Sequence, residues 1–231
     1  CDYEGLKGFG LPIIRDGCQS VGASRGGVYH FGEATCASGN GGKNVPAGEA
    51  GWVLTDHDGI AERVRQIISH GENFGTSWVG MNGRMPELTA CVAWYGLQEL
   101  EERNKRRQDL AGELNALRHL EIVRAGINRT FDDPEGSHVF YVYPFTLDKN
   151  RCKVARSSFI SSMAKRDIPV GAGYIVPHLG RYKAFLEYAR GPLPVVEELS
   201  SRTLCILSTL TPDRPLSYAR EVAQAMRESL E

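Results

Sequence analysis

Leu11-Pro12-Ile13-Ile14-Arg15-Asp16-Gly17 is the stretch of sequence on which the fold depends. A short apolar run that ends in Arg-Asp-Gly is typical of a buried strand in a parallel sheet, with Asp16 at its carboxyl end. Ligands of open α/β sheets bind outside the carboxyl ends of the strands. We therefore expect an α/β domain in which Asp16 faces a binding site.

A glycine-rich segment lies between residues 22 and 51 and includes Ser38-Gly39-Asn40-Gly41-Gly42-Lys43. Glycine allows the backbone to approach a ligand closely. A P-loop does not fit, because the chain has Ala37 and Asn44 where that motif needs Gly and Ser or Thr. A second interpretation is a lysine that forms a Schiff base with pyridoxal phosphate, with Asp16 keeping the ring nitrogen protonated. A solvated lysine and a turn-forming aspartate remain the ordinary alternative.

The hydrophobic pattern predicts two domains with a boundary near residue 116, so that residues 1–116 form one domain and residues 117–231 the other. In the first we expect a strand at 52–55, a helix capped by Asp56 or Asp58 that ends at His70-Gly71, and a long helix over 86–117. In the second, an α+β domain, we expect strands at 120–124, 137–147, 168–170 and 204–207 and helices at 154–165 and 216–230.

Composition favours a small-molecule partner over a charged polymer. The chain has 231 residues, with 27 Lys+Arg against 28 Asp+Glu and a net charge of −1, which gives no footprint for nucleic acid or an anionic membrane. No stretch approaches the roughly 20 apolar residues of a membrane span. The six cysteines form no CxxC pair and the histidines have no metal-ligand spacing, so we expect no metal site and a reducing, cytoplasmic location.

Several segments together resemble the DegT/StrS family of pyridoxal phosphate-dependent sugar aminotransferases. Residues 13–23 are similar to the family's IEDAAQAxGA segment, and Ser38–Asn44 is similar to its SFxxxKN segment. The order and spacing continue over residues 11–110, and the tail also looks related through Gly173-Tyr174 and Pro177-His178. The other matching segments are Phe31-Gly32-Glu33 (FGD), Gly48–Asp56 (GEGG and TxD), His70–Asn73 (HGEN) and Gly80–Leu88 (GxNxRxxEI).

The resemblance implies the α/β fold of pyridoxal phosphate-dependent transferases of fold type I, which is aspartate aminotransferase-like. Residues 1–116 would be the C-terminal part of the large cofactor-binding domain, and residues 117–231 the small α+β domain. Lys43 would bind the cofactor as a Schiff base and then act as the proton shuttle, while Asp16 would pair with the pyridine nitrogen. Gln19 would lie beside the ring hydroxyl and Ser38 would bind the phosphate. Asn82 would reach the phosphate in the neighbouring subunit of a homodimer.

The sequence departs from the family pattern at a few positions and in one larger respect. Gly39 replaces the aromatic residue of SF, and Ala50, Thr89, His30 and Glu33 replace other family residues. We expect Gly39 and its neighbour to loosen the loop beside the cofactor. The family's first half of the large domain, with its GTxAL-like helix start and ring-stacking aromatic, has no counterpart here. The chain also begins without Met, so we expect a C-terminal part that binds the cofactor weakly or not at all by itself.

The function implied by the resemblance is amino transfer from glutamate or glutamine to a keto group of a sugar nucleotide, sugar phosphate or cyclitol. The product would enter aminosugar, surface polysaccharide or antibiotic biosynthesis. Two alternatives remain open. A dehydratase on the same scaffold goes with a histidine in place of the lysine, so Lys43 argues against it. A non-catalytic or regulatory protein of the same fold is favoured if the first half is missing in the cell.

Overall fold

The computed structural model describes residues 3–24, 29–71, 78–117, 127–129, 138–148, 150–173, 178–188, 191–200, 204–207 and 213–230. They form two compact units. The first extends to Lys105 and includes Val139, and the second begins at Arg106 and includes Phe140 and the chain beyond it. The division falls inside helix α4 (Leu100–Leu117), whereas the sequence pattern places a boundary near the end of this helix.

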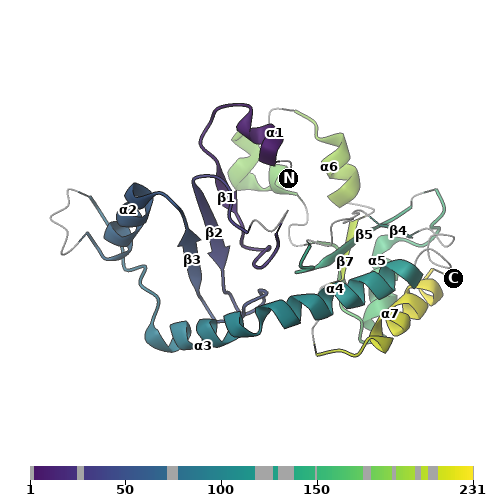
Figure 1. Cartoon of the computed structure of the whole chain (residues 1–231). Helices are drawn as coiled ribbons and strands as arrows, with labels where there is room; N and C mark the ends of the chain where they lie inside the picture. The colour runs from purple at the N-terminus through teal and green to yellow at the C-terminus, as the bar shows by residue number, and fades with distance from the viewer. Residues whose placement is uncertain are drawn as a thin grey trace. The chain divides into compact units, whose positions relative to one another are not determined.

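The first unit contains a three-stranded sheet (Figure 1), preceded by the short helix α1 (Tyr3–Lys7). The strands lie in the order β1 (Ile14–Asp16), β2 (Ala34–Ser38) and β3 (Gly51–Leu54). β1 and β2 are parallel, with Asp16 opposite Cys36, while β2 and β3 are antiparallel, with Ser38 opposite Gly51. The carboxyl ends of β1 and β2 therefore lie at the same edge of the sheet, and they carry Asp16 and Ser38.

The predicted parallel strand before Asp16 is present, but its expected bounds and burial are wrong. The strand begins at Ile14, and the side chains of Leu11 and Ile14 are 71% and 73% exposed. β1 is the outermost strand of the described sheet and pairs with β2 alone. A strand that is only three residues long and has one neighbour offers little surface against which these two side chains can pack.

Three helices follow the sheet. α2 (Asp58–Ile68) has His57 as its N-cap residue, and no side chain caps the helix, so the expected capping by Asp56 or Asp58 is wrong. The backbone N–H of His57 donates to the hydroxyl of Thr55 at 3.1 Å. Asp58 instead occupies the first turn, where its charge favours the helix dipole. The long helix expected over 86–117 is divided into α3 (Glu87–Gln98) and α4 by Glu99, at φ −93° and ψ −5°.

The second unit contains an antiparallel sheet in the order β4 (Ile127–Arg129), β5 (Tyr143–Leu147), β7 (Leu204–Leu207) and β6 (Val170–Gly171). Three predicted elements are confirmed within a few residues: the helix at 154–165, the strand at 204–207 and the helix at 216–230. The strand expected at 120–124 lies outside the described residues. The short elements at 127–129 and 179–198 were not predicted. The helices of this unit are α5 (Arg156–Ala164), the 3-10 helices η2 (Leu179–Arg181) and η3 (Lys183–Tyr188), α6 (Pro194–Glu198) and α7 (Ser217–Glu228).

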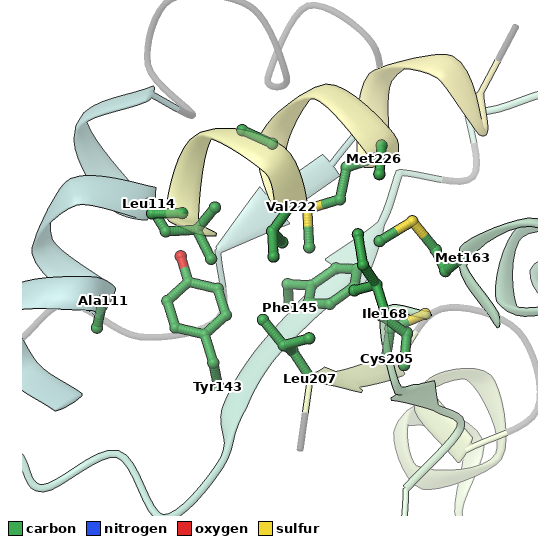
Figure 2. Close-up of a cluster of buried hydrophobic side chains, with 14 of the residues drawn as sticks. Ala111, Leu114, Tyr143, Phe145, Met163, Ile168, Cys205, Leu207, Val222 and Met226 are labelled. Carbon is green, nitrogen blue, oxygen red and sulfur yellow. The ribbon is translucent and has the colours of Figure 1, made fainter. Parts of the chain in front are cut away.

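The core of the second unit forms around alternate residues of β5. Tyr143, Phe145 and Leu147 are buried because successive residues of a strand point to opposite faces. Phe145 packs edge to face against Phe159 of α5, with ring centroids 6.1 Å apart. Figure 2 shows Val222 and Met226 of α7 next to Phe145, and Leu114 of α4 near Tyr143. Helices α4, α5 and α7 thus cover one face of this sheet with apolar side chains.

In the part of the chain that the structure describes, no helix has both the length and the apolar character needed to cross a membrane.

Candidate active site

Asp16 lies at the carboxyl end of β1, in a tight turn that leaves its carboxylate exposed. The backbone N–H of Gly17 donates to the carbonyl of Cys36 at 2.8 Å, which extends the pairing of β1 and β2 by one residue. The backbone N–H of Cys18 then donates to Oδ1 of Asp16 at 3.0 Å. Hydrogen bonds from Cys18 hold the pKa of Asp16 below its usual value, and the positive charge of Lys43 contributes in the same direction. Asp16 is therefore a stable anion at this edge of the sheet.

Cys18 is a site residue that the sequence argument missed. Its hydrogen bond to Asp16 is the largest cause that raises the pKa of its thiol to about 11, and burial adds to the effect. The sulfur also lies 3.9 Å from the carbonyl oxygen of Cys36. The sequence does offer one indication of this contact. Cys18 lies two residues after Asp16, and an aspartate side chain often accepts a hydrogen bond from the backbone N–H two residues later.

The loop between β2 and β3 is organised by Asn40. The backbone N–H of Asn40 donates to the hydroxyl oxygen of Ser38 at 3.2 Å, and its side-chain amide donates to Glu49 at 2.8 Å. Its carbonyl accepts the backbone N–H of Lys43 at 2.8 Å. These bonds fold the glycine-rich segment into a turn that starts at the end of β2 and includes Lys43.

The structure contradicts the expectation that Gly39 loosens this loop. Gly39 is buried, its N–H donates to the carbonyl of Ala50 at 2.8 Å, and its carbonyl accepts the N–H of Ala47 at 2.7 Å. A Cβ at this position would lie 2.9 Å from the Cβ of Ala50 and 3.0 Å from the ring of Trp52. Close packing against Ala50 and against Trp52 of β3 therefore holds the loop in place without the aromatic side chain of the family pattern.

The structure brings Asp16 and Lys43 into one group. Lys43 is half-buried, and its charge acts on both the carboxylate of Asp16 and the thiol of Cys18. This contribution is smaller than that of the hydrogen bonds from Cys18, and it has the sign expected of a positive charge in the next loop of the sheet. Ser38 lies at the end of the neighbouring strand, two residues beyond the register partner of Asp16. Two loops from parallel strands thus bring an anion, an amine and a hydroxyl to one edge of the sheet.

The remaining predicted site residues are less closely connected to this group. Gln19 is exposed in the turn after Asp16. Asn82 pairs with Ser69 in an isolated bridge after α2, and its Oδ1 accepts the backbone N–H and the Nε–H of Arg84, each at 3.4 Å. Asn82 therefore belongs to the turn between α2 and α3. Glu72, Asn73, Tyr174 and Pro177, which carry part of the resemblance, lie outside the described residues.

Comparison with known proteins relates most of the chain to a family of aminotransferases. The model of the DegT/DnrJ/EryC1/StrS aminotransferase family matches residues 6–226. A curated relative, the uncharacterized protein MJ1066 of Methanocaldococcus jannaschii, is 26% identical over 96% of this chain. The chain spans 62% of the length of that relative.

Solved structures agree with this assignment. The structure of DesV from S. venezuelae, in complex with a ketimine intermediate, is 26% identical, with a TM-score of 0.86 over 100% of this chain and 62% of its own. DesI in the presence of its TDP-sugar product is 22% identical, with a TM-score of 0.86 over 99% of this chain and 59% of its own. These similarities confirm the predicted α/β fold of the type I pyridoxal phosphate-dependent transferases. The chain belongs to the DegT/DnrJ/EryC1/StrS aminotransferase family.

Proposed function

We propose that the protein is a pyridoxal phosphate-dependent aminotransferase that moves an amino group from glutamate or glutamine to a keto group. The acceptor is a nucleotide- or phosphate-linked keto sugar or a cyclitol, and the product enters aminosugar, polysaccharide or antibiotic biosynthesis. One observation carries the proposal: the parallel strands β1 and β2 end at the same edge of the sheet in Asp16 and Ser38, and the loop that follows β2 carries Lys43. Family membership and the TDP-sugar product of DesI support the choice of a sugar acceptor.

The residues at this edge of the sheet fit pyridoxal phosphate by their chemistry. Asp16 has a lowered pKa, so it stays ionised and can hold a protonated pyridine nitrogen in place. The hydroxyl of Ser38 accepts a bond from Asn40, and its own proton can be donated to a phosphate oxygen. The half-buried Lys43 supplies the amine that this cofactor requires. When bound, the cofactor supplies an electron sink for the carbon from which a proton is removed.

Each residue of the group has one task in this proposal. The Nζ of Lys43 would hold the cofactor through its aldehyde group, and as a free amine it would serve as the base that moves a proton at the substrate. Asp16 keeps the ring nitrogen protonated, and Cys18 keeps Asp16 ionised and oriented. Gln19 would contact the ring hydroxyl, and Ser38 would bind the phosphate.

The assembly around this site is also part of the proposal. The first unit is the end of the large cofactor-binding domain, and the second unit is the small domain. Asn82 contributes to the phosphate site of a neighbouring subunit in a homodimer, which agrees with its exposure on a turn. We assign the protein to the cytoplasm, since the described cysteines Cys18, Cys36, Cys91, Cys152 and Cys205 are free thiols. Nucleic acid and membranes are not among its partners in this proposal.

The test is a half-reaction with the protein expressed from its complete reading frame and loaded with pyridoxal phosphate. Glutamate and glutamine are added separately, and the pyridoxamine phosphate released after denaturation is measured. We expect conversion by the unmodified protein and by Lys153→Ala, an exposed-lysine control, and none by Lys43→Ala. TDP-linked keto sugars then serve as acceptors for the second half-reaction. A protein that binds the cofactor but converts it with neither donor contradicts the proposal.

A further inference from the structure

Asn44, the residue directly after Lys43, is buried in the first unit with 1% of its surface exposed. Its side-chain amide donates to Oδ1 of Asn104 at 2.8 Å and to the carbonyl of Val139 at 3.2 Å. Both hydrogens of this amide are thereby used, which is the expected state of a polar group so far from water. The loop that carries Lys43 is therefore attached to the first turns of α4 through a side chain.

Asn104 connects the same helix to the segment that carries Asp16. It is 5% exposed, and its amide Nδ2 donates to the carbonyl of Val21 at 3.1 Å. Gly22 allows this approach, because a Cβ there would lie 2.4 Å from Nδ2 of Asn104 and the backbone has a φ of +85°. Asn104 thus uses its acceptor toward one loop of the site and a donor toward the other.

The turn between Asp16 and Val21 is itself closed by local bonds. The backbone N–H of Ser20 donates to the carbonyl of Gly17 at 3.0 Å, and Nη2 of Arg15 donates to the hydroxyl of Ser20 at 2.9 Å. A displacement of Val21 is therefore transmitted to Asp16 within a few residues. On the other side of Asn104, Asn44 and Lys43 are adjacent in the chain, so no flexible segment separates the anchor from the amine.

We propose that Asn44 and Asn104 are positioning residues that fix Lys43 relative to Asp16. The pair holds two loops from different strands on a common support, the start of α4, so that the amine and the carboxylate reach one ligand. This role rests on the proposed function, in which both groups bind the same cofactor. Neither asparagine touches the cofactor, and each acts through the loop that it anchors.

The two hydrogen bonds of Asn104 predict that two substitutions of this residue affect different segments of the chain. A general loss of stability would affect both segments alike. Asn104→Asp keeps the oxygen that accepts from Asn44 but removes the donor to Val21. Asn104→Leu, of similar size, removes both. The first variant therefore releases only the segment at 17–22, whereas the second also releases the segment at 39–47. Tyr143→Phe, which breaks a hydrogen bond to Asn115 in the second unit, is the matched control.

Hydrogen exchange of the cofactor-free protein, expressed from its complete reading frame, tests this asymmetry. We expect Asn104→Leu to accelerate exchange about tenfold in both segments and Asn104→Asp to accelerate it only at 17–22. Amides of α2 and α7 report that the first and second units of each variant are folded. Tyr143→Phe should leave both segments unchanged. Equal effects of the two Asn104 variants, or no effect at 17–22 in either, would overturn the proposal.

A second measurement uses the cofactor-loaded protein and reports on the amine itself. The pH midpoint of the visible absorbance of bound pyridoxal phosphate should shift in Asn104→Leu, because Lys43 and Asp16 no longer keep their spacing, and it should stay unchanged in Tyr143→Phe. An unchanged midpoint in Asn104→Leu, together with accelerated exchange, contradicts the positioning role. If the unmodified protein binds no cofactor at Lys43, the proposed function fails, and the exchange result still decides whether the two loops are coupled.

Discussion

In the second unit β5 directs Tyr143, Phe145 and Leu147 into a closed apolar core, whereas in the first unit β1 and β3 leave Ile14, Val53 and Leu54 exposed. The second unit is therefore held together mainly by burial of apolar surface. The loops of the first unit that carry Asp16 and Lys43 are held by amide hydrogen bonds and by glycines in close contact with their neighbours. The second unit should therefore lose stability when side-chain atoms are removed from its core, and the first unit when side-chain atoms are added to its loops.

Removal of a large side chain from the closed core should have the largest effect. Phe145 is fully buried at the centre of the second unit, so Phe145→Ala should lower the free energy of unfolding by about 3–5 kcal/mol, as the cavity cannot close completely. Ile14→Ala, at an exposed position of β1, should change it by less than about 0.5 kcal/mol. Urea denaturation of both variants measures the difference, and similar losses would remove the contrast between the two units.

The next largest loss of stability is expected when a methyl group is added to the loop between β2 and β3 in the first unit. Gly39→Ala places a Cβ against Ala50 and Trp52, and the resulting overpacking should lower stability by about 1–3 kcal/mol. Gly41 lies two residues further along the same loop, where a Cβ meets nothing within 4 Å, so Gly41→Ala is the control and should be tolerated. Thermal unfolding compares the two variants. If Gly39→Ala is as stable as Gly41→Ala, the loop is not packed as described.

A polar contact within the apolar core should contribute a smaller amount. The hydroxyl of Tyr143 donates to Oδ1 of Asn115 at 2.5 Å while its ring stays buried. Tyr143→Phe keeps the ring and should lower the free energy of unfolding by about 1 kcal/mol. Tyr182→Phe, at an exposed tyrosine in the same unit, is the control. A loss as large as that of Phe145→Ala would show that hydrogen bonding, and not burial, dominates this core.

The smallest effect concerns reactivity and leaves stability nearly unchanged. The pKa of Cys18 is raised to about 11, so at pH 8 only about one thiol in a thousand is ionised and alkylation should be slow. Asp16→Asn removes the main cause of the shift and should accelerate alkylation of Cys18. Asp58→Asn, in the first turn of α2, should not. Peptide mapping after iodoacetamide treatment separates Cys18 from the exposed Cys91.

The same contact fixes the sign of a pH effect at Asp16. Its pKa is lowered in the folded chain, so the stabilisation by Cys18 and Lys43 is present above the pKa that aspartate has when unfolded. It is lost as the pH falls through the lowered value. The protection of Cys18 from alkylation by Asp16 should therefore persist throughout the neutral and mildly acidic range.

Local patterns allowed much of the fold to be predicted. The parallel strand before Asp16, strand 204–207 and helices α5 and α7 follow from apolar runs or helical spacing. The 3-10 helices and α6 at 179–198 are too short for a periodic pattern, so they were missed. The exposure of Ile14 depends on the position of β1 at the edge of the described sheet, which its own sequence does not specify.

The residues of the candidate site also fall into two groups: those that a local sequence pattern reveals and those that only the folded chain reveals. Asp16, Ser38 and Lys43 could be selected because each lies in a segment with a distinctive local pattern. Asn104 could not, because its partners Asn44 and Val21 are 60 and 83 positions away and only the folded chain brings them together. Cys18 lies close to Asp16 in sequence, but its effect depends on the direction in which its thiol points.

The most direct test of the account is to locate the covalent attachment of pyridoxal phosphate. The protein expressed from its complete reading frame is incubated with the cofactor, reduced with borohydride and mapped by peptide mass spectrometry, in parallel with Lys43→Ala and Lys153→Ala. We predict a reduced cofactor label on the Lys43 peptide of the unmodified protein and of Lys153→Ala, and no specific label in Lys43→Ala. A label on a different lysine, or none in a folded protein, would contradict it.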